Sequence, residues 1–173
     1  MMIMMSMRGA RIAVALTSML ALAACSNKNA TGPGLANGAG GGLGGAGGIA
    51  APGTPQDFVV NVGDRVFFEE DHSDLSGTAQ ATLTKQAQWL RTYPAFTVTI
   101  EGHADERGTR EYNIALGARR AQSTRDYLVS QGIPAQRMRT ISYGKERPVA
   151  VCNDASCWTQ NRRAVTVLNG GSS

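Results

Sequence analysis

The chain has 173 residues, of which 42% are hydrophobic and 17% charged, and its formal net charge is +4. Removing Arg8 and Arg11, which lie in the N-terminal segment described next, leaves 15 cationic side chains against 13 anionic ones, or +2. Charges of both signs are interspersed, so the composition lacks the concentrated basic patch of a nucleic-acid-binding protein and excludes nucleic acid as the expected partner.

The first 24 residues have the pattern of an export signal. A short basic region ends at Arg11, and a mostly apolar run follows over residues 12–24. A helix of that length spans about 20 Å, short of the ~30 Å hydrocarbon core of a bilayer, which suits a signal peptide. The run ends in Leu22-Ala23-Ala24-Cys25, the lipobox pattern of bacterial lipoproteins. We therefore predict lipidation of Cys25, where several acyl chains would anchor the chain stably; an ordinary signal peptide followed by a chance cysteine is the alternative.

Residues 25–57 are predicted to form the lipidated N-terminus and a flexible tether. Gly, Ala, Asn, Pro and Thr dominate this segment, and residues 38–48 are almost wholly Gly and Ala. Such a segment cannot bury enough surface to offset the entropy of ordering it. Its root-mean-square span is about 30 Å, which suits a target at a distance from the membrane; a spacer without functional length is the alternative. Ser26 stands where lipoprotein sorting rules place an aspartate for inner-membrane retention, which favours the cell outer membrane.

The first half of the remaining chain alternates strand and helix patterns. Short strands are predicted at residues 59–62 and 65–68, with a Gly-Asp turn between them. Ser76 is placed to cap a helix over about residues 78–93. Residues 96–102 then alternate apolar and polar side chains, the pattern of a half-buried strand.

The second half repeats the alternation. Thr109 is expected to cap a longer helix that ends near residue 131, where a glycine and a proline follow. A brief turn or helix at 135–138 leads into a strand at 139–143, and the last strand is predicted at 163–168. Helices that alternate with strands predict an α/β sandwich, with the helices packed on one face of a mixed β-sheet. We expect this domain to span residues 58–168 and a disordered tail to occupy residues 169–173.

A group of polar residues follows the predicted strand at 96–102. The loop carries Asp105, and the helix after it presents Asn113 and Arg120 seven residues apart on one face. Apolar residues border that face, so Arg120 is expected to be partly enclosed. A carboxylate and a guanidinium together suit a zwitterion, because the first binds an ammonium and the second a carboxylate in a bidentate pair. Taken alone, the same residues also fit a structural ion pair.

The phrases around these residues resemble the OmpA C-terminal family, and within it most closely the peptidoglycan-associated lipoproteins of the Tol–Pal system. The phrases are Asp105-Glu-Arg-Gly-Thr109, Glu111-Tyr-Asn-Ile-Ala-Leu-Gly117, Ile141-Ser-Tyr-Gly-Lys145 and Gln160-Asn-Arg-Arg-Ala-Val165. The resemblance is collinear over about residues 59–168, and the lipobox and tether agree with it. It implies an OmpA C-terminal-like sandwich that binds peptidoglycan noncovalently.

The resemblance also implies roles for single residues. Asp105 and Arg120 match the pair that holds the free amino-acid end of diaminopimelate in the peptide stem, and Asn113 can add an amide contact. Asp71 aligns with a further ligand-contacting aspartate, and the two residues before it, Glu69 and Glu70, stand where the family often has small or aromatic residues.

Arg162 matches an arginine of the closing motif, with either a binding or a structural role. His103 is expected to be a buried, hydrogen-bonded residue rather than a metal ligand, and His72 a loop residue near the site. No metal site and no cofactor are predicted, because no convincing set of additional ligands accompanies these residues.

Cys152 and Cys157 lie in the predicted loop before the last strand. With Cys25 acylated they form an even pair in an oxidising periplasm, and we predict a disulfide that closes the loop. Two free thiols are the alternative, and a zinc site would need more ligands.

The sequence therefore predicts a lipoprotein that links the outer membrane to the cell wall, with roles in envelope integrity and cell division. The resemblance implies TolB and TolA as partners. An OmpA-like anchor of a secretion or motor complex is one alternative. A wall-degrading enzyme is another, but it would need a nucleophile or metal with a positioned base, so no catalytic residue and no enzymatic activity are predicted.

Overall fold

The computed structural model of the chain describes residues 50–170. The predicted signal peptide, the lipidation site Cys25, residues 25–49 of the tether and residues 171–173 lie outside the described residues. Within residues 50–170, no helix has the length and apolar character needed to cross a membrane.

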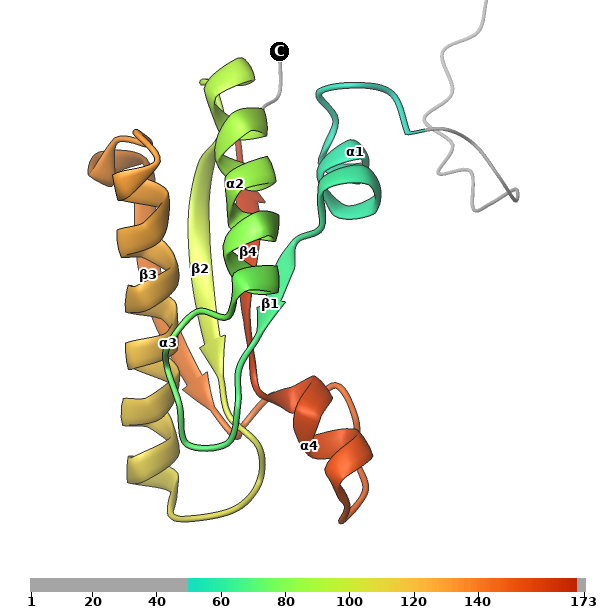
Figure 1. The fold of residues 1–173 in the computed structure, drawn as a ribbon, viewed down its shortest axis with the longest axis vertical. Coiled ribbons are helices and arrows are strands. Elements are labelled where there is room, and N and C mark those ends of the chain that lie inside the picture. The colour runs from blue at the N-terminus through green and yellow to red at the C-terminus, as the bar shows by residue number, and fades with distance from the viewer. Residues whose placement is uncertain (1–49, 171–173) are drawn as a thin grey trace, which may run out of the picture. The chain divides into compact units, whose positions relative to one another are not determined.

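The described residues contain a four-stranded mixed sheet in the order β1-β4-β2-β3 (Figure 1). β1 (Arg65–Phe67) and β2 (Thr97–His103) both run antiparallel to β4 (Arg163–Asn169), which lies between them. β3 (Met138–Gly144) completes the sheet in parallel with β2. The predicted mixed sheet is therefore confirmed, and each of the strands predicted from residue 65 onward is present within one or two residues of its expected bounds.

Two long helices, α2 (Gly77–Thr92) and α3 (Arg110–Ser130), cover one face of this sheet (Figure 1). Each begins at the predicted cap: the Ser76 hydroxyl accepts a hydrogen bond from the Ala79 amide, and the Thr109 hydroxyl accepts one from the Tyr112 amide. The predicted turn at 135–138 is the short 3₁₀ helix η2 (Ala135–Arg137). The predicted arrangement of helices on one face of a mixed sheet is confirmed.

The core fills the space between the two helices and the sheet. The alternation in β2 buries Val98 and Ile100 and leaves Thr97, Thr99 and Glu101 more exposed. The core includes apolar side chains from α2 and α3 that are fully buried: Leu83, Ala87, Leu90, Ala121 and Leu128. Burying such side chains is the main force that holds the two layers together.

The predicted strand at 59–62 is wrong, because these residues form a π-helical turn, η1 (Phe58–Val62), which continues the short helix α1 (Pro55–Asp57). The consecutive valines suggested a strand, but the contacts of the neighbouring residues decide otherwise. Phe58 packs edge-on against Trp89, with 5.0 Å between ring centroids, while Val59 and Val60 remain exposed. Tertiary packing has overridden local β-propensity here.

The folded domain also begins earlier and ends later than expected. The Asp57 carboxylate accepts hydrogen bonds from the Trp89 indole at 2.7 Å and from the Gly53 amide at 2.9 Å, so residues assigned to the tether pack on α2. At the other end β4 includes Asn169, the first residue of the predicted tail. A further helix, α4 (Ala155–Asn161), replaces part of the predicted loop before β4, and the Asp154 side chain caps it through the Ser156 amide.

Candidate binding site

The predicted site lies at the end of β2, where a close approach between β2 and α3 sets its geometry. Gly102 and Gly117 face each other, and a Cβ added to Gly102 would lie 1.8 Å from the backbone oxygen of Gly117. Only glycine permits two backbones to come this close. The loop at 104–109 then connects the end of β2 to the start of α3.

Asp105 is buried in the 104–109 loop and has two arginine partners. Its Oδ2 accepts hydrogen bonds from Arg107 Nη2 at 2.7 Å and from Arg162 Nη1 at 3.4 Å, while Oδ1 accepts from the Arg107 amide at 3.2 Å. Burial opposes ionisation of this carboxyl, but the hydrogen bonds from Arg107 and Arg162 outweigh burial and hold the pKa of Asp105 below its ordinary value. The site therefore contains a stable carboxylate.

Arg120 is wholly enclosed, more than the sequence predicted, with 0% of its surface exposed. Its Nε donates to the His72 carbonyl at 2.9 Å, Nη1 to the His103 carbonyl at 2.9 Å and Nη2 to the Glu69 carbonyl at 3.0 Å. Desolvation lowers the pKa of Arg120 to about 10, helped by the charge of Arg162, so the guanidinium is still a cation at neutral pH. Arg120 thus joins the 69–72 loop to the end of β2.

Asn113 and Arg162 also lie inside the site. The Asn113 side chain is 1% exposed and donates to the Arg107 carbonyl at 2.7 Å, so it holds the backbone of the 104–109 loop against α3. Arg162 donates through Nε to the Phe68 carbonyl at 3.1 Å and through Nη1 to Asp105. Both side chains hold backbone or carboxylate groups of the site in place.

Asp71 lies at the exposed edge of the site. Its φ of 56° is in the left-handed region, which aspartate tolerates better than most residues. The Tyr112 hydroxyl from α3 donates to Asp71 Oδ1 at 3.4 Å. The structure thus brings four predicted residues together, namely Asp105, Arg120, Asn113 and Arg162, and places Asp71 at their solvent side.

The sequence interpretation missed Arg107 and its neighbours. Besides Asp105, Arg107 pairs with Glu70 at 2.7 Å between Nη1 and Oε1, and its guanidinium carbon lies 4.1 Å from the centre of the Trp158 ring. The Trp158 indole nitrogen donates to the Glu106 carboxylate. The position of Arg107 two residues after Asp105 was a signal, but nothing in the sequence placed Glu70 and Trp158 beside it.

The disulfide and α4 position Trp158. The structure joins Cys152 and Cys157 in a disulfide, with 5.7 Å between the Cα atoms. The Asn161 carboxamide, at the end of α4, accepts from the Val149 amide and donates to the Ala150 carbonyl. The disulfide therefore holds the first half of α4, and the Asn161 hydrogen bonds hold its end. Trp158 directly follows Cys157.

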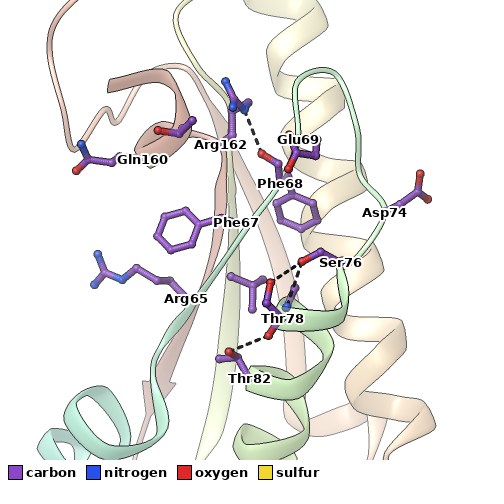
Figure 2. A pocket seen from close by; sticks show the side chains of 13 residues that line it. Arg65, Phe67, Phe68, Glu69, Asp74, Ser76, Thr78, Thr82, Gln160 and Arg162 are labelled. Carbon is purple, nitrogen blue, oxygen red and sulfur yellow. Dashed lines mark hydrogen bonds between the residues drawn. The ribbon is translucent and has the colours of Figure 1, made fainter. Parts of the chain in front are cut away.

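A groove of about 510 Å³ adjoins the site between β1, the start of α2 and α4 (Figure 2). Phe67 extends into it, and Thr78 of α2 and Gln160 of α4 stand on opposite sides (Figure 2). Glu69 and Arg162 line the groove and also belong to the site, so the two are continuous. The sequence did not predict this groove.

His103 differs in one respect from its predicted environment. It is buried, but neither ring nitrogen has a hydrogen-bond partner among residues 50–170, so the expectation of a hydrogen-bonded histidine is wrong. The ring packs 5.5 Å from the Tyr143 ring, and the Glu101 carboxylate lies 3.7 Å from Nε2. Desolvation, with the charges of Arg163 and Arg147, lowers the pKa of His103 to about 4. No group of three or more metal-ligating side chains is present in the described part of the chain.

Comparison with known proteins agrees with this geometry. Residues 67–163 match the OmpA family. A peptidoglycan-associated lipoprotein of Agrobacterium fabrum is 65% identical over 158 residues, which cover 91% of this chain and 86% of that protein. The chain belongs to the OmpA family, among its peptidoglycan-associated lipoproteins.

Solved structures support the same assignment to the peptidoglycan-associated lipoproteins. The crystal structure of the peptidoglycan-associated lipoprotein from Burkholderia pseudomallei matches with a TM-score of 0.63 and 38% identity, covering 67% of this chain and 100% of that one. The C-terminal domain of Helicobacter pylori MotB matches with a TM-score of 0.59 over 63% of this chain and 86% of that one, but at 18% identity. The likeness to MotB is one of fold alone.

Proposed function

We propose that this protein is an outer-membrane lipoprotein that links the outer membrane to the cell wall by binding the diaminopimelate of peptidoglycan stem peptides noncovalently. The observation that carries the proposal is the ionised, buried Asp105, which accepts hydrogen bonds from the guanidinium groups of Arg107 and Arg162. The free end of diaminopimelate is a zwitterion, with an ammonium and a carboxylate on one carbon. A site that presents an anion beside cations complements both groups.

The proposal gives each predicted residue a role. Asp105 receives the ligand's ammonium, and Arg120 offers its two remaining N–H groups, since three of five are already bonded. Asp71 adds a carboxylate at the exposed edge. Asn113 and Arg162 keep the loops in position.

The expected affinity for one stem is modest. Each charge-assisted hydrogen bond contributes about 1.5–3 kcal/mol, whereas association costs about 4–15 kcal/mol. A lipid anchor at Cys25 and a tether over the segment before residue 50 would confine the domain near a polymer with many stems. Confinement raises the effective concentration and makes the attachment persistent.

The names of the similar proteins support the rest of the proposal. The Agrobacterium fabrum relative is called a peptidoglycan-associated lipoprotein. We propose that this chain is lipid-anchored in the outer membrane with its domain in the periplasm, and that it acts within the Tol–Pal system in envelope integrity and cell division. TolB and TolA are the proposed protein partners.

We further propose that the protein binds and does not catalyse. General acid–base catalysis is most efficient with a group whose pKa lies near the working pH. The pKa of Asp105 lies below its ordinary value, and that of Arg120 is about 10, so neither group exchanges a proton readily at neutral pH. Both suit permanent ion pairing.

A sacculus pull-down tests the proposed function. Purified full-length protein should sediment with isolated sacculi, and Asp105→Asn should lower the bound fraction about tenfold or more, because a charge-assisted contact is lost. Arg110→Gln is the matched control, since this exposed arginine pairs with Glu146 outside the site. Circular dichroism verifies that each variant is folded. Equal binding by Asp105→Asn and the parent would refute the site.

A further inference from the structure

The groove between β1, the start of α2 and α4 is connected to the proposed diaminopimelate site through Arg162 (Figure 2). Arg162 Nη1 donates to Asp105 in the site at 3.4 Å, and Nε donates to the Phe68 carbonyl at the wall of the groove at 3.1 Å. The groove volume of about 510 Å³ is that of a small-ligand pocket. A ligand held at Asp105 therefore has room for a further part of itself directly beside the site.

One wall of the groove is the unpaired edge of the sheet. β1 is the outermost strand, and among residues 50–170 only β4 pairs with it. The Asp64 carbonyl and the Phe68 amide bond to the backbone beside them on the β4 side, at 2.7 and 2.9 Å. Because bonding alternates along an antiparallel pair, the N–H and C=O groups of Arg65 and Phe67 face away from β4. Both residues line the groove, so their backbone groups are available to a ligand that carries amides.

The side chains of the groove combine one exposed aromatic ring with uncharged polar groups. Phe67 is 49% exposed and extends into the groove (Figure 2). Thr78 and Gln160 stand on opposite sides of it. Apolar and aromatic surface with a few polar groups is the usual lining of a small-ligand site. A sugar ring suits this lining, because its C–H groups form apolar faces and its polar groups surround the rim.

The charges of the groove disfavour an acidic ligand. The Asp64 carboxylate holds the Arg65 guanidinium through two hydrogen bonds, at 2.8 and 3.0 Å, and Arg162 is occupied by the carboxylate of the site. Glu69 and Asp74 are exposed and add negative charge to the lining. A phosphate or carboxylate polymer would be repelled here. The glycan backbone of peptidoglycan is uncharged wherever its carboxyl groups are joined to stem peptides as amides.

An extended protein segment is the other ligand class that a free strand edge can bind. β1 has only three residues, and the backbone groups of only two of them face away from β4. This edge is short compared with an ordinary strand pair of five or six residues. It fits separate amide groups better than a continuous peptide strand.

We propose that the groove is a second subsite for the cell wall, which binds N-acetylated sugars of the glycan next to the stem held at Asp105; this inference rests on the proposed function. The N-acetyl group is an amide, so it accepts from an N–H and donates to a C=O of the free β1 edge. The Phe67 ring packs against a sugar face. Two amino acids separate diaminopimelate from the sugar, a span of roughly 10 Å, so one ligand reaches both subsites.

Calorimetric titration of the full-length protein with two matched ligands tests this proposal. One ligand is a stem peptide that contains diaminopimelate, and the other is the muropeptide with the same stem on its N-acetylated disaccharide. The parent should bind the muropeptide about three- to tenfold more tightly, as expected for one or two neutral hydrogen bonds. Phe67→Ala should bind the stem peptide like the parent and lose most of that gain. Circular dichroism verifies that the variant is folded.

Ile141→Ala is the matched control variant. Ile141 is also an exposed apolar residue, at 41%, but it lies on β3 at the opposite edge of the sheet. This variant should keep the full gain from the disaccharide. A loss of the gain in both variants would show that exposed apolar surface in general, and not the groove, binds the sugar.

Two tetrasaccharides test the role of the N-acetyl group. Chitotetraose carries N-acetyl groups where cellotetraose carries hydroxyls, and both are uncharged. Chitotetraose should shift the nuclear magnetic resonance signals of the Arg65 and Phe67 amides, and cellotetraose should shift them much less. Equal shifts with both sugars would contradict the pairing of the N-acetyl amide with the β1 edge. No shift with either would leave an extended protein segment as the better occupant and would overturn the proposal.

Failure of this proposal is distinguishable from failure of the proposed function. If the parent binds the stem peptide but gains nothing from the disaccharide, or if Phe67→Ala keeps the gain, the groove is not a sugar subsite and the proposed function stands. If the parent binds neither the stem peptide nor the muropeptide, the proposed function fails together with this inference.

Discussion

At the scale of single residues, the site combines charged groups that stay ionised over the physiological range with a nearby buried histidine that stays neutral. Asp105 is kept ionised by Arg107 and Arg162, and Arg120 remains charged despite its burial. His103 lies at the end of β2, two residues before Asp105, and burial keeps it neutral by lowering its pKa to about 4. The acid sensitivity of this region of the fold is therefore expected to come first from His103.

The stability of the domain should fall as the pH drops from about 6.5 towards the His103 pKa of about 4. The unfolded chain binds a proton in this range while the folded protein does not, so lowering the pH favours unfolding; above pH 6.5 neither state is protonated and the effect is absent. A shift of that size corresponds to roughly 3–4 kcal/mol when the pH falls below the folded-state pKa. Urea unfolding at pH 7.5 and at pH 5 measures the change.

The matched variant is His103→Phe. The ring nitrogens of His103 have no hydrogen-bond partners to lose among the described residues, so Phe should fold and should show a smaller decrease in stability between pH 7.5 and pH 5. An identical decrease in His103→Phe and the parent would show that other groups cause the acid sensitivity.

At the scale of elements, the position of the site depends on how closely α3 packs on β2. A Cβ on Gly102 would overlap the backbone of Gly117, which is not the flexible end of a side chain and cannot move aside easily. The candidate site residues on the 104–109 loop and on α3 lie together because this approach is possible. The close contact between α3 and β2 is therefore needed for the site as well as for the core.

Gly102→Ala should destabilise the domain by about 1–3 kcal/mol or more, as expected for overpacking. Gly77→Ala is the control: it begins α2, has no atom within 4 Å of an added Cβ, and should be neutral or slightly stabilising because alanine favours the helix. Thermal unfolding of both variants compares them directly. Equal melting temperatures for Gly102→Ala and the parent would mean that the two backbones can separate without cost.

The elements also show what the sequence could predict. The caps at Ser76 and Thr109 and the alternation in β2 are local signals, and the helices and strands that depend on them are confirmed. The turn at 58–62 was not predicted, because it depends on packing against Trp89. The helix α4 was not predicted either, because the segment around the two cysteines was interpreted as a loop.

The sequence likewise predicted one part of the candidate site and missed another. Asp105, Arg120 and Asn113 lie within one continuous motif, and their proximity follows from the strand, loop and helix that carry them. The contact between Arg107 and Glu70 joins residues 37 positions apart, and the orientation of Trp158 depends on α4. Such contacts follow from the tertiary fold, and periodicity and spacing do not determine them.

At the scale of the whole molecule, the proposed activity divides between a domain that binds modestly and an anchor that keeps it near its target. The described domain supplies the proposed zwitterion-binding site of a few charged groups, and the proposed lipid at Cys25 supplies membrane attachment. Neither part alone would join membrane to wall, because a single stem contact dissociates readily and a lipid anchor has no affinity for the wall.

Competition for isolated sacculi tests the central claim most directly, namely that the site recognises the zwitterionic end of diaminopimelate. Full-length protein bound to sacculi is challenged with a stem peptide that contains diaminopimelate, or with the same peptide containing lysine, which keeps the ammonium but lacks the adjacent carboxylate. We predict that the diaminopimelate peptide releases the protein and that the lysine peptide does not at the same concentration. Release by both peptides alike, or by neither, would contradict the account.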